Sequence, residues 1–339
     1  MPRPIIVDCA GPILSDEEKT FFQKMQPYGF ILFKRHCQSP EQLRHLTKSL
    51  RDCLDHDAVP ILIDQEGGRV ARMTPPHWRQ SPAGGVFADL AKVDLHKAER
   101  AVFLNAYLMA CDLKDVGVNV DCYPLLDILH PQTHDVIGDR SFGEDVDIVS
   151  KLGRSACEGL LNGGVLPVIK HIPGHGRATL DSHHALPRVA ASRTELEQDF
   201  APFRALCDMP LAMTAHILYE ALDPSACATL SKHIVHDIIR HDIGFKGVIL
   251  SDDLMMKALG GTLNERATAA LTAGCDVLLL CNASLAEQKT VLEGLGLMSD
   301  NTHRHVDMHF RYREEWASTE HKPFPDIKSA KAELQRLIS

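Results

Sequence analysis

The chain has 339 residues, of which 45% are hydrophobic and 24% are charged, a composition typical of a soluble globular enzyme with one large core or two modest ones. Its net charge of −9 argues against a nucleic-acid surface, which would need clustered Lys and Arg to neutralise phosphates. No run approaches the roughly 20 apolar residues that cross a bilayer, so we expect no membrane partner.

The N-terminal segment and the cysteines indicate the compartment. Ile5–Val7 runs directly into Asp8 and is too short for the apolar core of a secretory signal. The ten cysteines are scattered without CxxC pairs, and several, such as Cys9 and Cys275, lie in or beside apolar runs. Free thiols are typical of a reducing compartment, so we expect a cytoplasmic protein.

Eight short runs rich in Val, Ile and Leu predict buried strands. They are Pro4–Ala10, Gly29–Phe33, Val59–Asp64, Val118–Tyr123, Leu166–His171, Leu211–His216, Gly247–Asp252 and Cys275–Cys281. A longer amphipathic segment follows each run, as expected when crossover helices connect parallel strands. No GxGxxG follows the first run, so the eight units favour an α/β fold of the closed (β/α)8 TIM-barrel type over a doubly wound sheet.

Capping signals mark several helix starts. The segments Ser15–Glu18 and Ser192–Glu195 both read S-x-x-E, which is a capping box. Ser39-Pro40 places a cap before a proline at the first helical position, and Ser231 and Ser284 precede two further helices. These caps support the alternation of strands and helices.

The end of the chain differs in composition. Beyond about Gly296 it is richer in charge and histidine, and it includes the stretch HRHVDMH from His303 to His309. A metal-binding tract is one interpretation, but a solvated terminal helix or tail is the simpler one. We therefore predict a single-domain catalytic barrel over residues 1–300 and a C-terminal extension over 301–339, packed on or near the barrel.

Polar residues interrupt the apolar runs where the active site of a TIM barrel is built, at the carboxyl ends of the strands. Five runs end in such residues: Asp64–Arg69, Lys170-His171, His216, Ser251–Asp253 and Asn282. Each could merely end its strand, but their convergence on one rim favours a site. Asp64 and Asp252 directly follow apolar residues, so either carboxylate could serve as nucleophile, base or hydroxyl acceptor.

The segment after the fifth run is crowded with ionisable groups. Asp181 lies two residues before His183 and could orient its ring for acid/base chemistry near neutral pH. His171 and His175 have the spacing of a zinc site, but Pro173-Gly174 denies them the required helix, so we expect no metal and no cofactor. A solvated loop residue remains an alternative for His175, as it does for His184.

Three motifs together resemble one family: Lys170–Gly176 with Asp181-Ser182-His183, Asp64–Val70, and Gly247–Leu254. The chain resembles the bacterial β-N-acetylhexosaminidases of glycoside hydrolase family 3, of the NagZ type, over roughly residues 5 to 295. One departure is Ile172, where relatives often carry an aromatic residue.

The resemblance implies roles for individual residues. Asp252 would be the nucleophile with Asp253 as a supporting group, and His183 would be the acid/base, oriented by Asp181. The residues that correspond to those binding the hydroxyls of N-acetylglucosamine are Asp64, Arg72, Arg140, Lys170 and His171.

The activity that the resemblance implies is retaining release of terminal β-linked N-acetylglucosamine from peptidoglycan fragments during cell-wall recycling. We expect a monomer whose partner is a small saccharide or muropeptide, and its aglycone preference stays open. Four alternatives also remain: participation of the substrate's own acetamido group, phosphorolysis, a metal-dependent hydrolase using His171, His175 and His183, and a non-catalytic sugar-binding protein.

Overall fold

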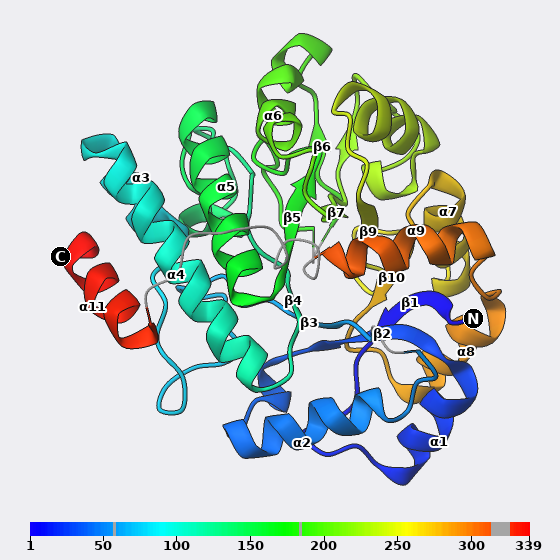
Figure 1. Ribbon diagram of the computed structural model, residues 1–339. Coiled ribbons are helices and arrows are strands. Elements are labelled where there is room, and N and C mark those ends of the chain that lie inside the picture. The colour runs from blue at the N-terminus through cyan, green and yellow to red at the C-terminus, as the bar shows by residue number, and fades with distance from the viewer. Residues whose placement is uncertain (57–58, 183–184, 313–325) are drawn as a thin grey trace.

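The computed structural model describes residues 1–56, 59–182, 185–312 and 326–339. Eight parallel strands close into a barrel in the order β1-β10-β9-β7-β5-β4-β3-β2 (Figure 1). They are β1 Arg3–Val7, β2 Pro27–Leu32, β3 Ile61–Ile63, β4 Val120–Asp121, β5 Leu166–Ile172, β7 Leu211–Thr214, β9 Val248–Asp253 and β10 Val277–Leu280. Each overlaps one of the eight runs, and the predicted TIM barrel is confirmed.

Helices surround the barrel and bury the outer faces of the strands, which is why the strands read as continuous apolar runs (Figure 1). The helices are α1 Asp16–Met25, α2 Pro40–Arg51, α3 Gly84–Val93, α4 Leu95–Asp115, α5 Val146–Gly163, α6 Arg193–Ala205, the π-helix η4 Ile234–Asp242, α7 Leu263–Ala273 and α8 Leu285–Gly294. Short 3₁₀ turns are η1 Lys34–His36, η2 Gly138–Arg140 and η3 Ala228–Leu230.

The predicted caps are confirmed. Ser15 and Ser192 form complete capping boxes, and so does Ser284. Ser39 accepts a hydrogen bond from a backbone N–H of the first turn of α2, and the Ser231 hydroxyl accepts one from the N–H of Ile234 at the start of η4. The apolar spacing of this segment is that of an α-helix, so the sequence does not predict the π geometry that η4 adopts.

A small parallel sheet outside the barrel was missed. β6 (Arg188–Val189) pairs with β8 (Leu218–Tyr219) and joins the segment after β5 to the segment after β7. Two residues per strand carry too little periodicity for a strand to be predicted. The predicted sixth strand was also too long, because β7 ends at Thr214 and His216 lies in the loop beyond it.

Two helices near the end of the chain pack on different parts of the molecule. On α9 (Asp300–Phe310), the ring of Phe310 lies 5.2 Å from the ring of Tyr28. α11 (Ile327–Ile338) lies beside α4, where Glu333 forms an ion pair with Arg100 at 2.7 Å (Figure 1). Among the described helices, none is both long and apolar enough to cross a membrane.

Candidate active site

A pocket of about 340 Å³ opens at the carboxyl ends of the barrel strands. Six of the predicted site residues line it: Asp64, Arg72, Arg140, Lys170, His171 and Asp252. Apolar side chains, among them Phe33 and Met213, complete its wall. The structure therefore brings together residues from β5 and β9 and from the segments that follow β3 and β4.

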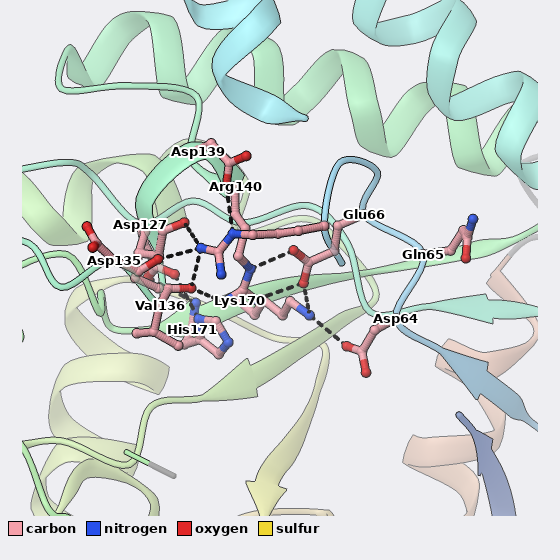
Figure 2. Close-up of polar contacts among 12 residues, drawn as sticks. Asp64, Gln65, Glu66, Asp127, Asp135, Val136, Asp139, Arg140, Lys170 and His171 are labelled. Atoms are coloured by element: carbon pink, nitrogen blue, oxygen red, sulfur yellow. Dashed lines mark hydrogen bonds and ion pairs between the residues drawn. The ribbon is translucent and has the colours of Figure 1, made fainter. Parts of the chain in front are cut away.

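A cluster of ion pairs forms one side of this pocket (Figure 2). Lys170 Nζ lies 2.9 Å from Asp64 Oδ1 and 2.7 Å from Glu66 Oε1. The Arg140 guanidinium donates two parallel hydrogen bonds to Glu66, at 2.7 and 2.8 Å, and Arg72 Nη2 lies 3.0 Å from Asp64 Oδ2. Three cations therefore face two carboxylates, a geometry in which charge-assisted hydrogen bonds are strong.

These pairs keep Asp64, Glu66 and Lys170 ionised. Burial alone raises the pKa of a carboxyl group, but the charges of Lys170 and Arg72 hold the pKa of Asp64 well below its usual range. Burial also raises the pKa of Glu66, but Arg140 and Lys170 outweigh it and lower that pKa to about 2. Burial opposes the charge on Lys170, yet the two carboxylates raise its pKa above the ordinary value.

The segment after β3 folds back so that Arg72 meets Asp64. The Gln65 side chain fastens this turn, because its Oε1 accepts hydrogen bonds from the N–H groups of Arg72 and Met73, at 2.9 and 3.0 Å. Gly67 has a φ of +96°, and a Cβ there would lie 2.2 Å from a backbone carbonyl oxygen. The turn therefore requires glycine at this position.

His171 is held by a carboxylate that the sequence analysis missed. Asp127 Oδ2 lies 2.7 Å from His171 Nδ1, and Asp127 Oδ1 accepts hydrogen bonds from the N–H groups of His171 and His175. Although burial raises its pKa, the neighbouring His171 brings the pKa of Asp127 to about 2. Since Nδ1 is engaged by Asp127, His171 presents Nε2 to the pocket. The available signal was an Asp directly after Leu125-Leu126.

His175 is buried at 3% exposure and lines the pocket, so it is not a solvated loop residue. Burial, followed by the charge of His171, lowers its pKa to about 4, and its ring is neutral at pH 7. Its Nδ1 has no hydrogen-bond partner among the described residues. In the described ranges, no three His, Cys, Asp or Glu side chains are grouped as ligands for a metal ion.

Asp252 and Asp253 also line the pocket, at the end of β9, which lies across the closed barrel from β3. Asp252 Oδ1 accepts a hydrogen bond from the N–H of Asp253 at 2.8 Å. Asp253 Oδ1 accepts from the N–H groups of Met255 and Cys281, both at 2.9 Å. Burial, with added repulsion from Asp252 and Asp8, raises the pKa of Asp253 to about 7.

The loop after β5 begins with a well-anchored stretch. The Gly174 carbonyl accepts a hydrogen bond from the Tyr219 hydroxyl at 2.7 Å, and the Gly176 carbonyl accepts one from Thr133 at 2.5 Å. Farther along, Ser182 is buried and lines the pocket, whereas its neighbour Asp181 is half-buried. The predicted acid/base His183, like His184, lies outside the described residues.

A closed (β/α)8 barrel with carboxylates and cations gathered at the carboxyl ends of its strands has the architecture of a barrel enzyme that binds a polar small molecule. Comparison with known proteins identifies the family. The family model "Glycosyl hydrolase family 3 N terminal domain" matches residues 9–308.

Named relatives agree with this match. The "Beta-hexosaminidase" of Alkalilimnicola ehrlichii is 40% identical over 284 residues, which are 82% of this chain and 80% of the relative. That of Chromobacterium violaceum is 40% identical over 288 residues, covering 83% and 80% of the two chains. The crystal structure of NagZ from Neisseria gonorrhoeae in complex with N-trifluoroacetyl-D-glucosamine has a TM-score of 0.88 at 32% identity, covering 100% of this chain and 98% of the other.

The chain therefore belongs to glycosyl hydrolase family 3. Within this family it is a β-hexosaminidase, a glycoside hydrolase, and the resemblance found in the sequence motifs is confirmed.

Proposed function

We propose that this β-hexosaminidase is a retaining exo-β-N-acetylglucosaminidase in which Asp252 is the nucleophile, His183 the acid/base and Asp181 the group that orients His183. One observation supports the proposal above all others. Asp252 lines the same pocket as the ion-pair cluster around Asp64 and Lys170, and its strand β9 lies across the closed barrel from β3, which Asp64 follows. A sugar ring held by that cluster would have a carboxylate within the same small cavity.

The proposed reaction has two steps. Asp252 attacks the anomeric carbon while His183 gives a proton to the leaving oxygen, which forms a covalent glycosyl-enzyme. His183 then takes a proton from water, and the water attacks the anomeric carbon and frees Asp252. Two inversions leave the product with the β configuration of the substrate.

The sugar hydroxyls would be held by groups whose positions are already fixed. Asp64 can accept from hydroxyls while Lys170 and Arg72 hold it in place, and Nε2 of His171 can contact another. Arg140 directs its donors to Glu66 and to the carbonyl of Val136, so it contributes to binding largely by fixing Glu66 (Figure 2).

The proposed substrates are peptidoglycan fragments that carry terminal N-acetylglucosamine on 1,6-anhydro-N-acetylmuramyl peptides, in cytoplasmic cell-wall recycling. The N-acylated glucosamine analogue in the N. gonorrhoeae relative supports an N-acetylglucosamine subsite. The proposal includes a catalytic domain over residues 1–300, an extension over 301–339, a monomeric state and no cofactor.

The test is hydrolysis of a chromogenic N-acetyl-β-glucosaminide beside the matching β-glucoside. Wild type should prefer the N-acetyl sugar, and Asp252→Ala should lose about 10³-fold or more in kcat, as should His183→Ala on a substrate with a poor leaving group. Asp115→Asn, which removes an exposed carboxylate on α4, is the control and should keep full activity. Equal wild-type rates on the two sugars would refute the N-acetyl specificity.

Four results separate the alternatives. A fluorinated N-acetylglucosaminyl fluoride should leave a covalent adduct on Asp252, whereas acetamido participation leaves none. N-acetylglucosamine 1-phosphate formed in phosphate buffer would indicate phosphorolysis. Loss of activity on exhaustive chelation would indicate a metal-dependent hydrolase, and unchanged function in Asp252→Ala would indicate a non-catalytic sugar-binding protein.

A further inference from the structure

Three buried polar side chains lie directly behind Asp252. Thr214 ends β7, His216 follows two residues later, and Thr229 lies in η3. All three are 0% exposed, and none of them lines the pocket. They therefore do not contact a bound sugar, and their hydrogen bonds have to be explained by what they do to the protein.

These side chains form a continuous chain of hydrogen bonds. The N–H of Asp252 lies 3.4 Å from Thr214 Oγ1, which lies 2.8 Å from Thr229 Oγ1. Thr229 Oγ1 lies 2.7 Å from His216 Nδ1, and His216 Nε2 lies 3.0 Å from the carbonyl oxygen of Asp253. The chain thus begins and ends on the backbone of Asp252-Asp253.

Each hydrogen bond in this chain can be assigned a donor and an acceptor. The Asp253 carbonyl can only accept, so His216 Nε2 carries a hydrogen. Burial lowers the pKa of His216, so its ring is neutral and Nδ1 accepts. The Thr229 hydroxyl therefore donates to Nδ1 at 2.7 Å in preference to the Ala215 carbonyl oxygen at 3.2 Å, and it accepts from Thr214. Thr214 in turn accepts from the N–H of Asp252.

The network holds the segment that carries the nucleophile. It fixes the N–H on one side of Asp252 and the carbonyl of the following residue, while the Asp252 carboxylate itself accepts from the N–H of Asp253 at 2.8 Å. The direction of the carboxylate therefore depends on peptide groups whose orientation the network determines. Neighbouring hydroxyls in such a directed chain also strengthen one another.

We propose that Thr214, Thr229 and His216 are positioning residues that set the direction of the Asp252 carboxylate for attack on the anomeric carbon. The inference rests on the proposed role of Asp252 as nucleophile. Misplacing a reacting atom by about 1 Å can cost about 10²-fold in rate even when binding is unaffected. A broken network should consequently slow the chemical step and leave sugar affinity unchanged.

The experiment compares Thr229→Val, which removes the hydroxyl at nearly constant volume, with Thr229→Ser, which restores it. Thr229→Val should lower kcat and the rate of adduct formation on Asp252 by about 10- to 100-fold, with the inhibition constant of N-acetylglucosamine within about twofold of wild type. Thr229→Ser should recover most of the rate. Thr47→Val on α2 is the control for loss of a buried hydrogen bond. It removes a hydroxyl that donates to the Val116 carbonyl oxygen at 2.7 Å, and it should keep wild-type kcat.

Two outcomes would overturn the proposal: wild-type rates of adduct formation in Thr229→Val, or loss of rate and of sugar affinity in equal proportion. If Thr229→Val does not fold, Thr214→Val and Thr214→Ser provide the same comparison one hydrogen bond closer to Asp252. Failure of the nucleophile assignment looks different, because wild type itself would then form no adduct on Asp252.

Discussion

The two sides of the pocket are built on opposite electrostatic principles. The binding side consists of Asp64, Glu66, Arg72, Arg140 and Lys170, where three cations hold the carboxylates ionised. The reacting side consists of Asp252 and Asp253, where adjacent carboxyl groups accept hydrogen bonds from backbone N–H groups. Accordingly, the pKa of Asp64 is lowered, by cations that outweigh its burial, and the pKa of Asp253 is raised, mainly by burial.

This difference suits the proposed reaction. A neutral sugar ring is well held by groups that ion pairs have already fixed in place, because they need no rearrangement when it enters. The transition state of glycoside hydrolysis resembles an oxocarbenium ion, so positive charge develops at the anomeric carbon. The Asp252 carboxylate stabilises that positive charge as it appears, whereas the binding side, with three cations to two carboxylates, would not.

Removal of Lys170 should have the largest effect, because it breaks the binding side. Lys170 is 1% exposed and forms ion pairs with both Asp64 and Glu66. Lys170→Met therefore leaves these two carboxylates without the cation that lies between them. Stranding a buried charge in this way costs about 3 to 5 kcal/mol. We expect a loss of that size in the free energy of unfolding in urea, together with loss of hydrolysis.

A compensating variant shows whether charge balance is the cause. Glu66→Gln combined with Lys170→Met removes one charge of each sign and should recover part of the lost stability, although activity stays low. If the double variant is no more stable than Lys170→Met alone, the cluster is held by packing and not by its charges.

Asp64→Asn should have a smaller effect on stability and a clear one on catalysis. The amide oxygen can still accept from Lys170 or Arg72, so the fold should survive. Charge-assisted hydrogen bonds to the sugar weaken, and a loss of about 3 kcal/mol corresponds to about 100-fold in kcat/KM. Steady-state kinetics on the chromogenic substrate, with Asp115→Asn as the control, measures this loss; a kcat/KM equal to wild type would remove Asp64 from the binding side.

The barrel and its pocket could be predicted because both follow from local pattern. Eight apolar runs separated by capped helices specify the strands, and parallel strands place the residues after each run on one rim. Asp64, Lys170 and Asp252 therefore line one pocket. In the sequence, more than a hundred residues separate Asp64 from Lys170, and about eighty separate Lys170 from Asp252.

The partners of these residues could not be predicted, because they depend on closure of the barrel. Asp127 reaches His171 across 44 residues, and Glu66 reaches Arg140 across 74. Neither spacing has a sequence signature. Thr229 was missed for the same reason, since a threonine in a short 3₁₀ turn shows no sign that it will meet Thr214 and His216.

The smallest expected effect is on the pH dependence of stability, which tests the reacting side. Folding raises the pKa of Asp253 to about 7, chiefly by burial, so above about pH 4 the folded protein keeps a proton there that the unfolded chain has lost. Stability gained from this group is therefore lost as pH rises from about 4 to 7. Asp253→Asn keeps an oxygen that can accept from Met255 and Cys281 but cannot ionise.

The melting temperature of wild type should consequently fall relative to that of Asp253→Asn by a few °C between about pH 5 and pH 7, and the difference should stay constant above about pH 8. The exposed Asp147→Asn serves as the control, with a curve parallel to wild type. Parallel curves for Asp253→Asn and wild type would mean that Asp253 is ionised throughout, and the contrast between the two sides of the pocket would then lie in geometry alone.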